Sequence, residues 1–346
     1  MDFSPNVAPA LRAEPHLAVR LCAPGRLHLG FLDPGGSLGR RFGSLGLVID
    51  GFETEIELSA SSVDQVSACN PAARAEVERS AAHLSTLQRH TGLHEPLHLK
   101  LVRVLPVHSG FGSGTQLALA IGRAFARWHH LDVSTPELAQ WLTRGLRSGI
   151  GIAGFDQGGL LLDGGPGADG SPAPVLSRIA LPAAWRVVVV QDGAHRGLSG
   201  ADERQAIATL APLPQAVAAD ICHQVLMRVL PGAASAEFAP FAAGITRIQQ
   251  ALGNHCAPAQ GGSAFTSAAV GRLIDWMGSA DPVCARGQSS WGPTGFAIFP
   301  SQARAQAVVD AARAANVVGA SLSVRIVAGR NSGATVIDQR SAPRRR

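Results

Sequence analysis

The sequence predicts an α+β protein, because short runs of alternating apolar and polar residues are interspersed with longer stretches whose apolar residues recur at helical spacing. The chain has 346 residues and 46% of them are hydrophobic, which is enough to bury a full core. The segment Gly164–Pro174 is rich in glycine and proline and predicts a surface loop near a domain boundary. We therefore expect two domains, residues 1–172 and 173–346.

The first domain is predicted to begin with strands, after a loose start through Pro15. Alternation from Leu17 to Leu29 predicts a strand, and the residues 33–39 that follow it are typical of a turn. Two further antiparallel strands are expected, joined by a turn at Asp50–Gly51. The remaining elements, in order, are strands at Leu47–Ile49, Glu53–Leu58 and Leu97–Leu105, and helices at Ala72–Thr91, Gln116–Trp128 and Thr135–Arg144, the last capped by Ser134 or Thr135.

The second domain is predicted to begin with a buried strand. Trp185–Gln191 contains four consecutive valines, which is typical of a strand covered on both faces. Helices and two more strands follow. In order, they are helices at Ala201–Leu210, Gln215–Leu230 and Phe238–Leu252, a strand at Phe296–Phe299, a helix at Gln302–Ala315 and a strand at Ser321–Val327.

The net charge of +5 comes almost entirely from arginine, since Lys100 is the sole lysine. Guanidinium groups favour anionic ligands, although a compositional bias toward arginine explains the excess equally well. The basic residues are scattered, and the one run, Arg344–Arg346, indicates a solvated tail. We therefore expect no nucleic-acid partner.

The sequence also indicates a cytoplasmic location with no membrane partner. The five cysteines, Cys22, Cys69, Cys222, Cys256 and Cys284, are far apart and form no metal-binding or disulfide pattern. Neither a secretory signal nor an apolar stretch long enough to cross a bilayer is visible.

The segment Pro106–Gln116 predicts an anion-binding loop that leads into a helix. Glycines at Gly110, Gly112 and Gly114 allow tight turns, and neighbouring hydroxyl groups lie close to the helix start. Backbone N–H groups and the helix dipole favour negative charge at such a place, so phosphate or pyrophosphate is the expected ligand. The pattern matches neither the Walker A loop nor the dinucleotide fingerprint, and a glycine turn without a ligand remains an alternative.

Two further segments, Ala23–Gly30 and Gly287–Gly295, accompany this loop. In this order the three segments resemble the signature of the GHMP kinase superfamily, and the resemblance covers almost the whole chain. It implies an N-terminal domain like the second domain of ribosomal protein S5 and a ferredoxin-like C-terminal domain.

The sequence departs from the kinases at two places. Where these kinases carry a catalytic carboxylate, the segment Arg147–Gly151 ends in glycine, which neither accepts a proton nor binds a metal. Gln288–Trp291 replaces the kinases' glycine run, and Asp156 is a displaced substitute for the missing carboxylate.

The departures resemble one branch of the superfamily, the beta-ribofuranosylaminobenzene 5'-phosphate synthases. The matching blocks are Arg26–Gly30 with Asp33, Gly39–Gly43, Gly110–Leu117, Arg147–Gly151 with Phe155–Gly159, and Gln288–Thr294. The resemblance implies that phosphoribosyl pyrophosphate reacts with 4-aminobenzoate or 4-hydroxybenzoate, releasing carbon dioxide and pyrophosphate, in tetrahydromethanopterin biosynthesis. An ATP-dependent small-molecule kinase is the alternative, and a non-catalytic ligand sensor or scaffold is a third possibility.

The expected site combines these segments, with magnesium as the expected cofactor and a homodimer as the expected assembly. Arginines would hold the sugar phosphate or the carboxylate, and Trp291 would stack on the aromatic substrate. Surface ion pairs, ordinary turns and core packing are the structural alternatives for these residues. The expected catalytic residues are Arg26, His28 and Asp156; the expected metal ligand is Asp33; and the expected binding residues are Ser109, Gly110, Gly112, Ser113, Gly114, Thr115, Gln116, Arg40, Arg41, Arg147, Ser148, Gln288, Ser289, Ser290 and Trp291.

Overall fold

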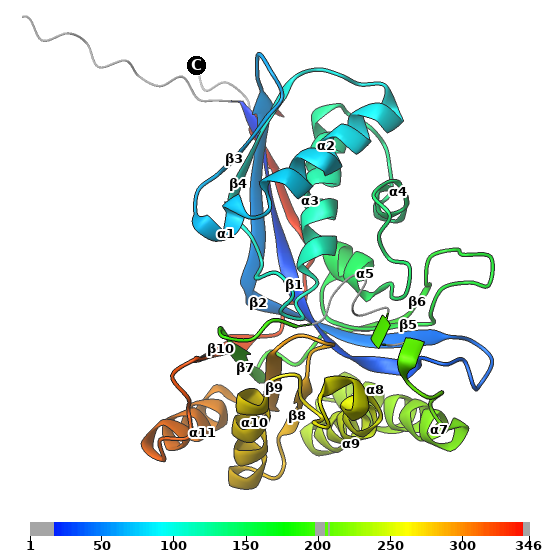
Figure 1. Cartoon of the computed structure of the whole chain (residues 1–346), viewed down its shortest axis with the longest axis vertical. Coiled ribbons are helices and arrows are strands. Elements are labelled where there is room, and N and C mark those ends of the chain that lie inside the picture. Colours follow the sequence, from blue (N-terminus) through cyan, green and yellow to red (C-terminus); the bar gives the residue numbers. More distant parts are fainter. Residues whose placement is uncertain (1–16, 198–204, 207, 342–346) are drawn as a thin grey trace, which may run out of the picture.

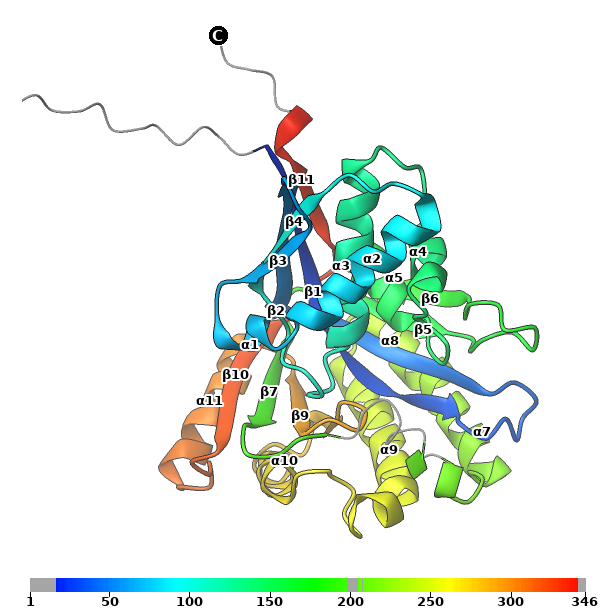
Figure 2. The ribbon, with the colours of Figure 1, turned by 45° about the horizontal axis from the view of Figure 1, so that its top comes forward.

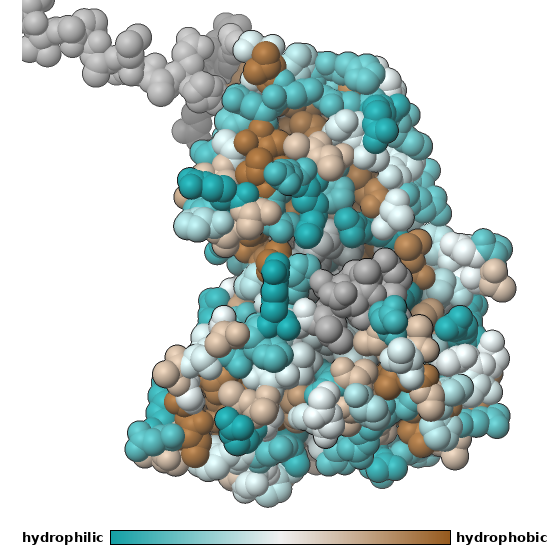
Figure 3. Space-filling view, viewed as in Figure 1, coloured by the Kyte–Doolittle hydropathy of each residue, from teal (hydrophilic) through white to brown (hydrophobic). Residues whose placement is uncertain are grey.

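The computed structural model describes residues 17–197, 205–206 and 208–341. The predicted loose start and the Arg344–Arg346 tail lie outside these residues, as does half of the predicted helix at Ala201–Leu210. The described chain forms a seven-stranded sheet and a four-stranded sheet, stacked one above the other with helices against each (Figure 1). Figure 3 shows the surface hollowed between the part that carries α1 and the part that carries α11.

The first sheet is built around two long strands, β1 (Ala18–Asp33) and β2 (Phe42–Ala60), which pair antiparallel. The end of β1 and the start of β2 bend away from the sheet. They extend as a hairpin across the helices α7 (Gln215–Gln224) and α8 (Leu230–Ala234) (Figure 2). The other strands of this sheet are β3 (Gln65–Ala68), β4 (Leu97–Arg103), β5 (Leu160–Asp163), β6 (Val175–Ile179) and β11 (Thr335–Asp338).

The predicted turn at Asp50–Gly51 is wrong, because β2 runs through it as one strand. Pro24 pairs with Glu53 and Arg26 with Val48, so residues 49–52 bulge opposite Gly25 alone. Gly51 has a φ of +78°, which glycine adopts without strain. The residues that predict a turn, Asp50 and Gly51, therefore form a bulge that bends the strand without ending it.

Helices cover one side of the first sheet (Figure 1). The long helix α3 (Ser113–Trp128) buries an almost continuous apolar face, and it begins three residues before the predicted start. Ser134 caps α4 (Thr135–Trp141) in a capping box with Glu137, as the sequence indicated. The remaining helices here are α1 (Pro71–Arg74), α2 (Val77–Thr91) and α5 (Ile150–Gln157), of which α5 was not predicted.

The second sheet has the strand order β10-β7-β9-β8, all antiparallel, which is the order of a ferredoxin-like module. Its strands are β7 (Arg186–Asp192), β8 (Ala285–Gln288), β9 (Thr294–Phe299) and β10 (Leu322–Ala328). The consecutive valines of β7 alternate between two cores, with Val187 and Val189 on one face and Val188 and Val190 on the other. The predicted buried strand is thereby confirmed.

Helices pack around this sheet. The predicted helix at Gln215–Leu230 forms a longer unit that contains one π-helical turn, and the helix at Phe238–Leu252 continues to Cys256. The segments are α7 (Gln215–Gln224), η1 (Val225–Val229), α8 (Leu230–Ala234), α9 (Phe238–Cys256), α10 (Ala268–Ala280) and α11 (Gln302–Ala314), of which α10 was not predicted.

Sheet membership does not divide at residue 172. The glycine-rich loop 164–174 joins β5 to β6 within the first sheet, and β11 returns from the end of the chain to pair with β1. Arg340 then donates hydrogen bonds to the carbonyl groups of Arg127 and Trp128 at the end of α3. The division into domains 1–172 and 173–346 stays a prediction.

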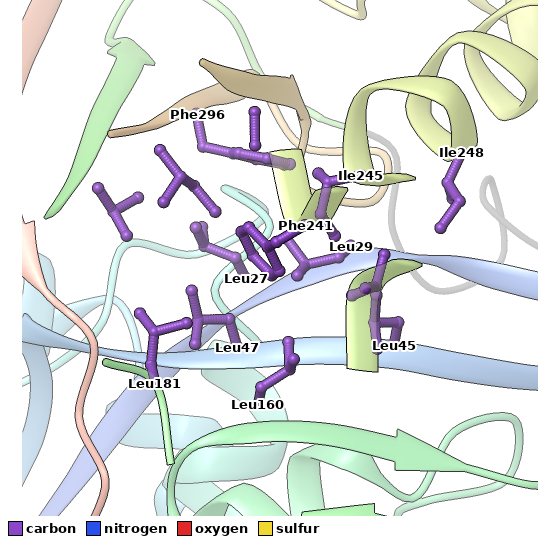
Figure 4. Packing of buried hydrophobic residues seen from close by; sticks show 14 of the residues in the cluster. Leu27, Leu29, Leu45, Leu47, Leu160, Leu181, Phe241, Ile245, Ile248 and Phe296 are labelled. Carbon is purple, nitrogen blue, oxygen red and sulfur yellow. The ribbon is translucent and has the colours of Figure 1, made fainter. Parts of the chain in front are cut away.

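A central core joins the two sheets. Leu27, Leu29, Leu45 and Leu47 from the long hairpin meet Phe241, Ile245 and Ile248 of α9 and Phe296 of β9 (Figure 4). Truncating one such leucine to alanine costs on the order of 2–5 kcal/mol of stability. Within the described residues, no helix is both long and apolar enough to cross a membrane.

Candidate active site

The hydroxyl group of Ser289 links the three segments singled out in the sequence. It accepts a hydrogen bond from the backbone N–H of His28 at 2.9 Å and donates one to the carbonyl oxygen of Gly110 at 2.7 Å. The Arg26 side chain donates to the same Gly110 oxygen at 3.1 Å. Segments 84 and 261 residues apart in the sequence thus converge on one point.

Gly110 and Gly112 allow this close packing. A Cβ on Gly110, whose φ is +83°, would lie 2.4 Å from the Ser289 carbonyl oxygen. A Cβ on Gly112 would lie 3.0 Å from the Cζ atom of Arg26, so glycine leaves room for the guanidinium against the loop. The loop then leads into α3, whose N-cap is Gly112. The glycines therefore bring a cation and a helix N-terminus together.

A cleft of about 650 Å³ extends from the loop and is strongly cationic. Four arginines line it, namely Arg26, Arg79, Arg144 and Arg147, and no Asp or Glu is among its described lining residues. A Cβ on Gly114 would lie 3.8 Å from Arg144 and 4.0 Å from Arg79, so both guanidinium groups face the first turn of α3. Such an arrangement favours a polyanion.

Arg79 and Arg144 were missed by sequence reasoning, because neither belongs to a motif. Arg79 lies on the predicted helix at Ala72–Thr91 and Arg144 at the end of another, and only the fold places them together. Arg144 donates to Nε2 of His83 at 3.3 Å. Burial and the charges of Arg144 and Arg79 lower the pKa of His83 to about 4, so this imidazole is neutral at pH 7 and acts as an acceptor.

Glu76 holds Arg79 in place. Its carboxylate accepts from Arg79 at 3.0 Å, and its side chain is largely buried. Burial raises the pKa of Glu76, while Arg79 and then Arg144 lower it in opposition. A neutral imidazole therefore holds Arg144 and a carboxyl group holds Arg79, while both guanidinium groups line the cleft.

A second cavity of about 450 Å³ adjoins the cleft and is mainly apolar. It lies between the long hairpin, α9 and the segment that precedes α7. Phe31, Phe42, Leu213 and Leu252 contribute to its wall. Arg41 also lines it, with its guanidinium 5.4 Å from the Phe42 ring centroid. This cavity suits a flat apolar ligand.

The cleft and the cavity share one wall. His28, Phe31, Arg147, Ser290 and Trp291 line both spaces. Trp291 is 6% exposed, and the His28 and Phe31 rings meet edge to face at a centroid distance of 4.5 Å. A molecule in the cleft and another in the cavity would meet at this wall.

Asp163 positions the segment Arg147–Gly151 and was also missed by sequence reasoning. It is 1% exposed and accepts hydrogen bonds from the Ser148 hydroxyl and from the backbone N–H groups of Gly149 and Ile150. The Ser44 hydroxyl donates to the same carboxylate. A buried carboxylate thus caps α5 and fixes the backbone beside Arg147.

Most of the predicted site residues are brought together. Two lie on the apolar cavity alone, Arg41 and Gln288. Those that line the cationic cleft are Arg26, His28, Gly110, Gly112, Ser113, Gly114, Thr115, Arg147, Ser148, Ser290 and Trp291. The predicted residues that line neither space are Ser109, Gln116, Ser289, Arg40, Asp33 and Asp156.

Ser289 and Gln116 lie near the cleft but serve the protein itself. Both are fully buried, and Gln116 donates to the carbonyl oxygen of Gly151 at 2.9 Å. Ser109 donates to the carbonyl oxygen of Val107. These side chains hold the walls of the site, whereas Arg40 is exposed to solvent.

The structure does not bring Asp156 to the cleft. It lies on the exposed side of α5, where its carboxylate accepts from the Thr135 hydroxyl at 2.6 Å. The expected substitute for the missing kinase carboxylate therefore has no support in the geometry.

Asp33 does not offer a magnesium site either. It is 3% exposed, and its carboxylate accepts from Ser37 and from the backbone N–H groups of Gly36 and Leu38, which closes the hairpin turn. No group of three or more His, Cys, Asp or Glu side chains among the described residues could hold a metal ion. The side chains present do not fit a protein-held magnesium ion, which prefers carboxylate oxygens.

Comparisons with known proteins agree with this architecture. Residues 77–162 match the family model described as the GHMP kinases N terminal domain. Beta-ribofuranosylphenol 5'-phosphate synthase of Archaeoglobus fulgidus is 34% identical over 301 residues, which cover 82% of this chain and 89% of that protein. The protein of the same name from Methanothermobacter thermautotrophicus is 29% identical over 344 residues, covering 91% of this chain and 97% of its own.

Solved structures share the fold at much lower identity. Homoserine kinase of Cytophaga hutchinsonii has a TM-score of 0.65 at 14% identity and covers 94% of this chain and 99% of its own. Phosphomevalonate kinase of Streptococcus pneumoniae also has a TM-score of 0.65 at 14% identity, covering 91% and 99%. The GHMP kinase fold predicted from the three motifs is confirmed.

Proposed function

Because this chain belongs to the beta-ribofuranosylphenol 5'-phosphate synthase family, we propose that it joins the ribose of phosphoribosyl pyrophosphate to a 4-substituted benzoate. The names of its relatives give a phenol as the aromatic part of the product, which favours 4-hydroxybenzoate over 4-aminobenzoate as the acceptor. Tetrahydromethanopterin biosynthesis is the proposed context.

The observation that carries this proposal is the shared wall. One substrate is a polyanionic sugar and the other is a flat aromatic acid, and the molecule has a cationic cleft beside an apolar cavity. The sugar carbon that reacts and the ring carbon that reacts would meet at His28, Phe31 and Trp291. Catalysis would then depend mainly on placing the two carbons in contact.

The proposed reaction balances without an added proton or oxidant. The bond between ribose C1 and the pyrophosphate oxygen breaks, and pyrophosphate leaves with the electron pair. The ring carbon that bears the carboxylate forms the new carbon–carbon bond to ribose C1. The bond to the carboxylate then breaks, carbon dioxide leaves, and its electron pair restores the aromatic ring.

The arginines of the cleft supply the electrostatic part. Arg79 and Arg144 beside the first turn of α3 would stabilise the charge that develops on departing pyrophosphate. Arg26 lies against Gly110, and Arg147 lies on the shared wall, close to where the 5'-phosphate or the carboxylate would bind. Magnesium is proposed only as an ion carried by the pyrophosphate, since the described side chains give it no site.

The described residues that line the cleft include no carboxylate that could serve a kinase. Gly151 is buried, and a Cβ there would lie 3.2 Å from the Cγ2 atom of Thr115. An aspartate at this position would need Thr115, which lines the cleft, to move by a few tenths of an ångström. We therefore favour transfer of the ribosyl group over transfer of a phosphoryl group.

A labelled-substrate assay tests the proposal. The protein is incubated with magnesium, phosphoribosyl pyrophosphate and carboxyl-labelled 4-hydroxybenzoate, with 4-aminobenzoate in a parallel reaction. We expect labelled carbon dioxide and pyrophosphate in equal amounts. Folded protein that releases neither would refute the proposal, and ATP consumption with a small alcohol or acid as acceptor would support the kinase instead.

Two arginines on one strand provide a matched pair for the same assay. Arg26→Ala removes the guanidinium beside Gly110 and should greatly reduce turnover, whereas Arg20→Ala removes an exposed ion pair with Glu57 and should leave turnover unchanged. Equal turnover of the two folded variants would remove Arg26 from the proposed site. A homodimer, which the resemblance implies, and a cytoplasmic location, which was expected from the absence of a visible secretory signal or membrane span in the sequence, remain proposals.

A further inference from the structure

The geometry points to His28 as the residue that binds the carboxylate of the aromatic acid, through a hydrogen bond donated by its Nε2–H at the shared wall. This inference rests on the proposed function and deepens it. It assigns one neutral donor to the group that the reaction later removes, and it makes His28 a determinant of specificity for acids over other phenols.

The tautomer of His28 follows from its surroundings. The backbone N–H of Gly30 donates to Nδ1 of His28 at 3.2 Å, so Nδ1 is an acceptor and bears no proton. A neutral imidazole then carries its proton on Nε2. The tautomer therefore presents an N–H donor on the other edge of the ring.

A bulge in β1 holds the ring in this orientation. The register with β2 shifts between His28 and Gly30, which frees backbone groups from the strand ladder. Three backbone groups at the bulge bond outside the ladder: the N–H of His28 donates to Ser289, the carbonyl of His28 accepts from Ser290, and the carbonyl of Leu29 accepts from Gln249. The segment 288–291 and α9 thus hold the backbone of the bulge, while the ring itself is held by the N–H of Gly30 and by its contact with Phe31.

The Nε2–H group has no hydrogen-bond partner among the described residues. His28 is 4% exposed, and its Nε2 atom is buried. Leaving a buried donor unpaired costs about 1–3 kcal/mol, and native proteins leave few such groups. Since His28 lines both spaces, a ligand atom at the shared wall would relieve this cost.

His28 serves as a donor rather than as an acid or base. Burial, followed by the charges of Arg26 and Arg147, lowers its pKa well below the ordinary value for histidine. The imidazole therefore stays neutral throughout the range in which an enzyme would work, and its Nδ1 is already occupied by Gly30.

The carboxylate fits this donor better than a phosphate group does. Phosphate oxygens have Arg79 and Arg144 within the cleft, whereas the ring of His28 packs on Phe31 at the shared wall. The carboxylate is attached to the ring carbon that forms the new bond, so it must lie where the two spaces meet. A neutral donor orients the carboxylate without forming an ion pair with it, and such an ion pair would oppose the loss of carbon dioxide.

Two substitutions of His28 distinguish loss of the Nε2–H donor from damage to the fold. His28→Asn keeps a side-chain oxygen that can accept from Gly30 but has no group that reaches the Nε2 position. His28→Gln places an amide N–H close to that position. We would measure the binding of 4-hydroxybenzoate, 4-methylphenol and inorganic pyrophosphate to each variant and to the wild type by calorimetry, without turnover.

We expect His28→Asn to weaken 4-hydroxybenzoate binding roughly 10- to 100-fold, as for loss of a hydrogen bond to a charged group. Binding of 4-methylphenol and pyrophosphate should stay within about 2-fold of wild type, and His28→Gln should restore part of the lost affinity. Unchanged 4-hydroxybenzoate binding in folded His28→Asn would overturn the inference, as would a selective loss of pyrophosphate binding.

Binding and turnover fail separately in this design. If the wild type binds 4-hydroxybenzoate through His28 but releases no carbon dioxide, the proposed function fails and the carboxylate contact stands. If the wild type turns over and His28→Asn binds 4-hydroxybenzoate normally, the proposed function stands and the carboxylate contact is refuted.

Discussion

The cationic cleft and the apolar cavity share five lining residues but are built in different ways. The cleft is organised by backbone, with Gly110, Gly112 and the first turn of α3 at its centre. The cavity is organised by packing, and its walls come from the long hairpin, α9 and the segment before α7. Anion binding depends on directional N–H groups, whereas aromatic binding depends on shape, so the two spaces should respond differently to substitution.

The largest effect should come from closing the cleft. Gly110→Ala places a Cβ 2.4 Å from the Ser289 carbonyl oxygen at a φ of +83°, so the loop and the segment 288–291 must separate. We expect pyrophosphate binding to be lost and stability to fall by about 2 kcal/mol or more, measured by calorimetry and chemical denaturation.

Gly170→Ala provides the control for backbone strain alone. Gly170 has a φ of +80°, a Cβ added to it would meet no atom within 4 Å, and it lines neither the cleft nor the cavity. This variant should lose stability but keep its pyrophosphate affinity. Equal pyrophosphate affinity in the two variants would contradict the close contact at Gly110.

Removing one arginine should weaken the cleft without affecting the cavity. Arg144→Met deletes a guanidinium that faces the first turn of α3 and leaves the neutral His83 behind it. Pyrophosphate affinity should fall on the order of 10- to 100-fold, while 4-hydroxybenzoate affinity should not change. Arg89→Met, an exposed site on α2 away from both spaces, is the control, and similar pyrophosphate affinities for the two variants would disprove the role of Arg144.

A substitution on the shared wall should affect the aromatic ligand more than the anion. Trp291→Leu removes a ring that is 6% exposed, and we expect 4-hydroxybenzoate affinity to fall about 3- to 10-fold. Pyrophosphate binding serves as the internal reference and Trp141→Leu, which lines neither space, as the matched variant. A larger loss of pyrophosphate than of 4-hydroxybenzoate would reverse our assignment of the two spaces.

The smallest expected effect is that a bound ligand protects the Cys256 thiol from alkylation. Cys256 lines the apolar cavity, and burial raises the pKa of its thiol to about 11, so it should react slowly with a neutral alkylating reagent at about pH 7.5. Bound 4-hydroxybenzoate should slow its labelling further, as followed by peptide mass spectrometry. The exposed Cys69 serves as the reference within the same protein, and labelling of Cys256 that 4-hydroxybenzoate leaves unchanged would place the ligand elsewhere.

Sequence reasoning recovered the elements whose signal is local. Strands β4 and β10 follow from alternation, β7 follows from four consecutive valines, and β9 was predicted at Phe296–Phe299. Helix α3 follows from a glycine loop that leads into an apolar helix. Helix α10 was missed because Ala268–Ala280 contains two glycines, which lower helix propensity, and its core packing supplies the difference. The turn at Asp50–Gly51 was misjudged because a bulge and a turn use the same residues.

The candidate site was predictable where motifs carry it and no further. Arg26, His28 and Ser290 belong to segments with recognisable order, and the structure gathers them on the cleft. Arg79, Arg144 and Asp163 carry no local signal, because their positions depend on how helices and strands pack. Asp156 was misplaced for the opposite reason: nearness in sequence to Gly151 does not put it on the same side of α5.

The pairing of β11 with β1 has a consequence for how the protein is made. One edge of the first sheet stays open until residues 335–338 have been synthesised, although β1 itself begins at Ala18. An unpaired strand edge can template wrong pairing with another nascent chain. Since Arg340 also donates a hydrogen bond to a carbonyl group at the end of α3, residues through 340 must emerge from the ribosome before this sheet and its contact with α3 are complete.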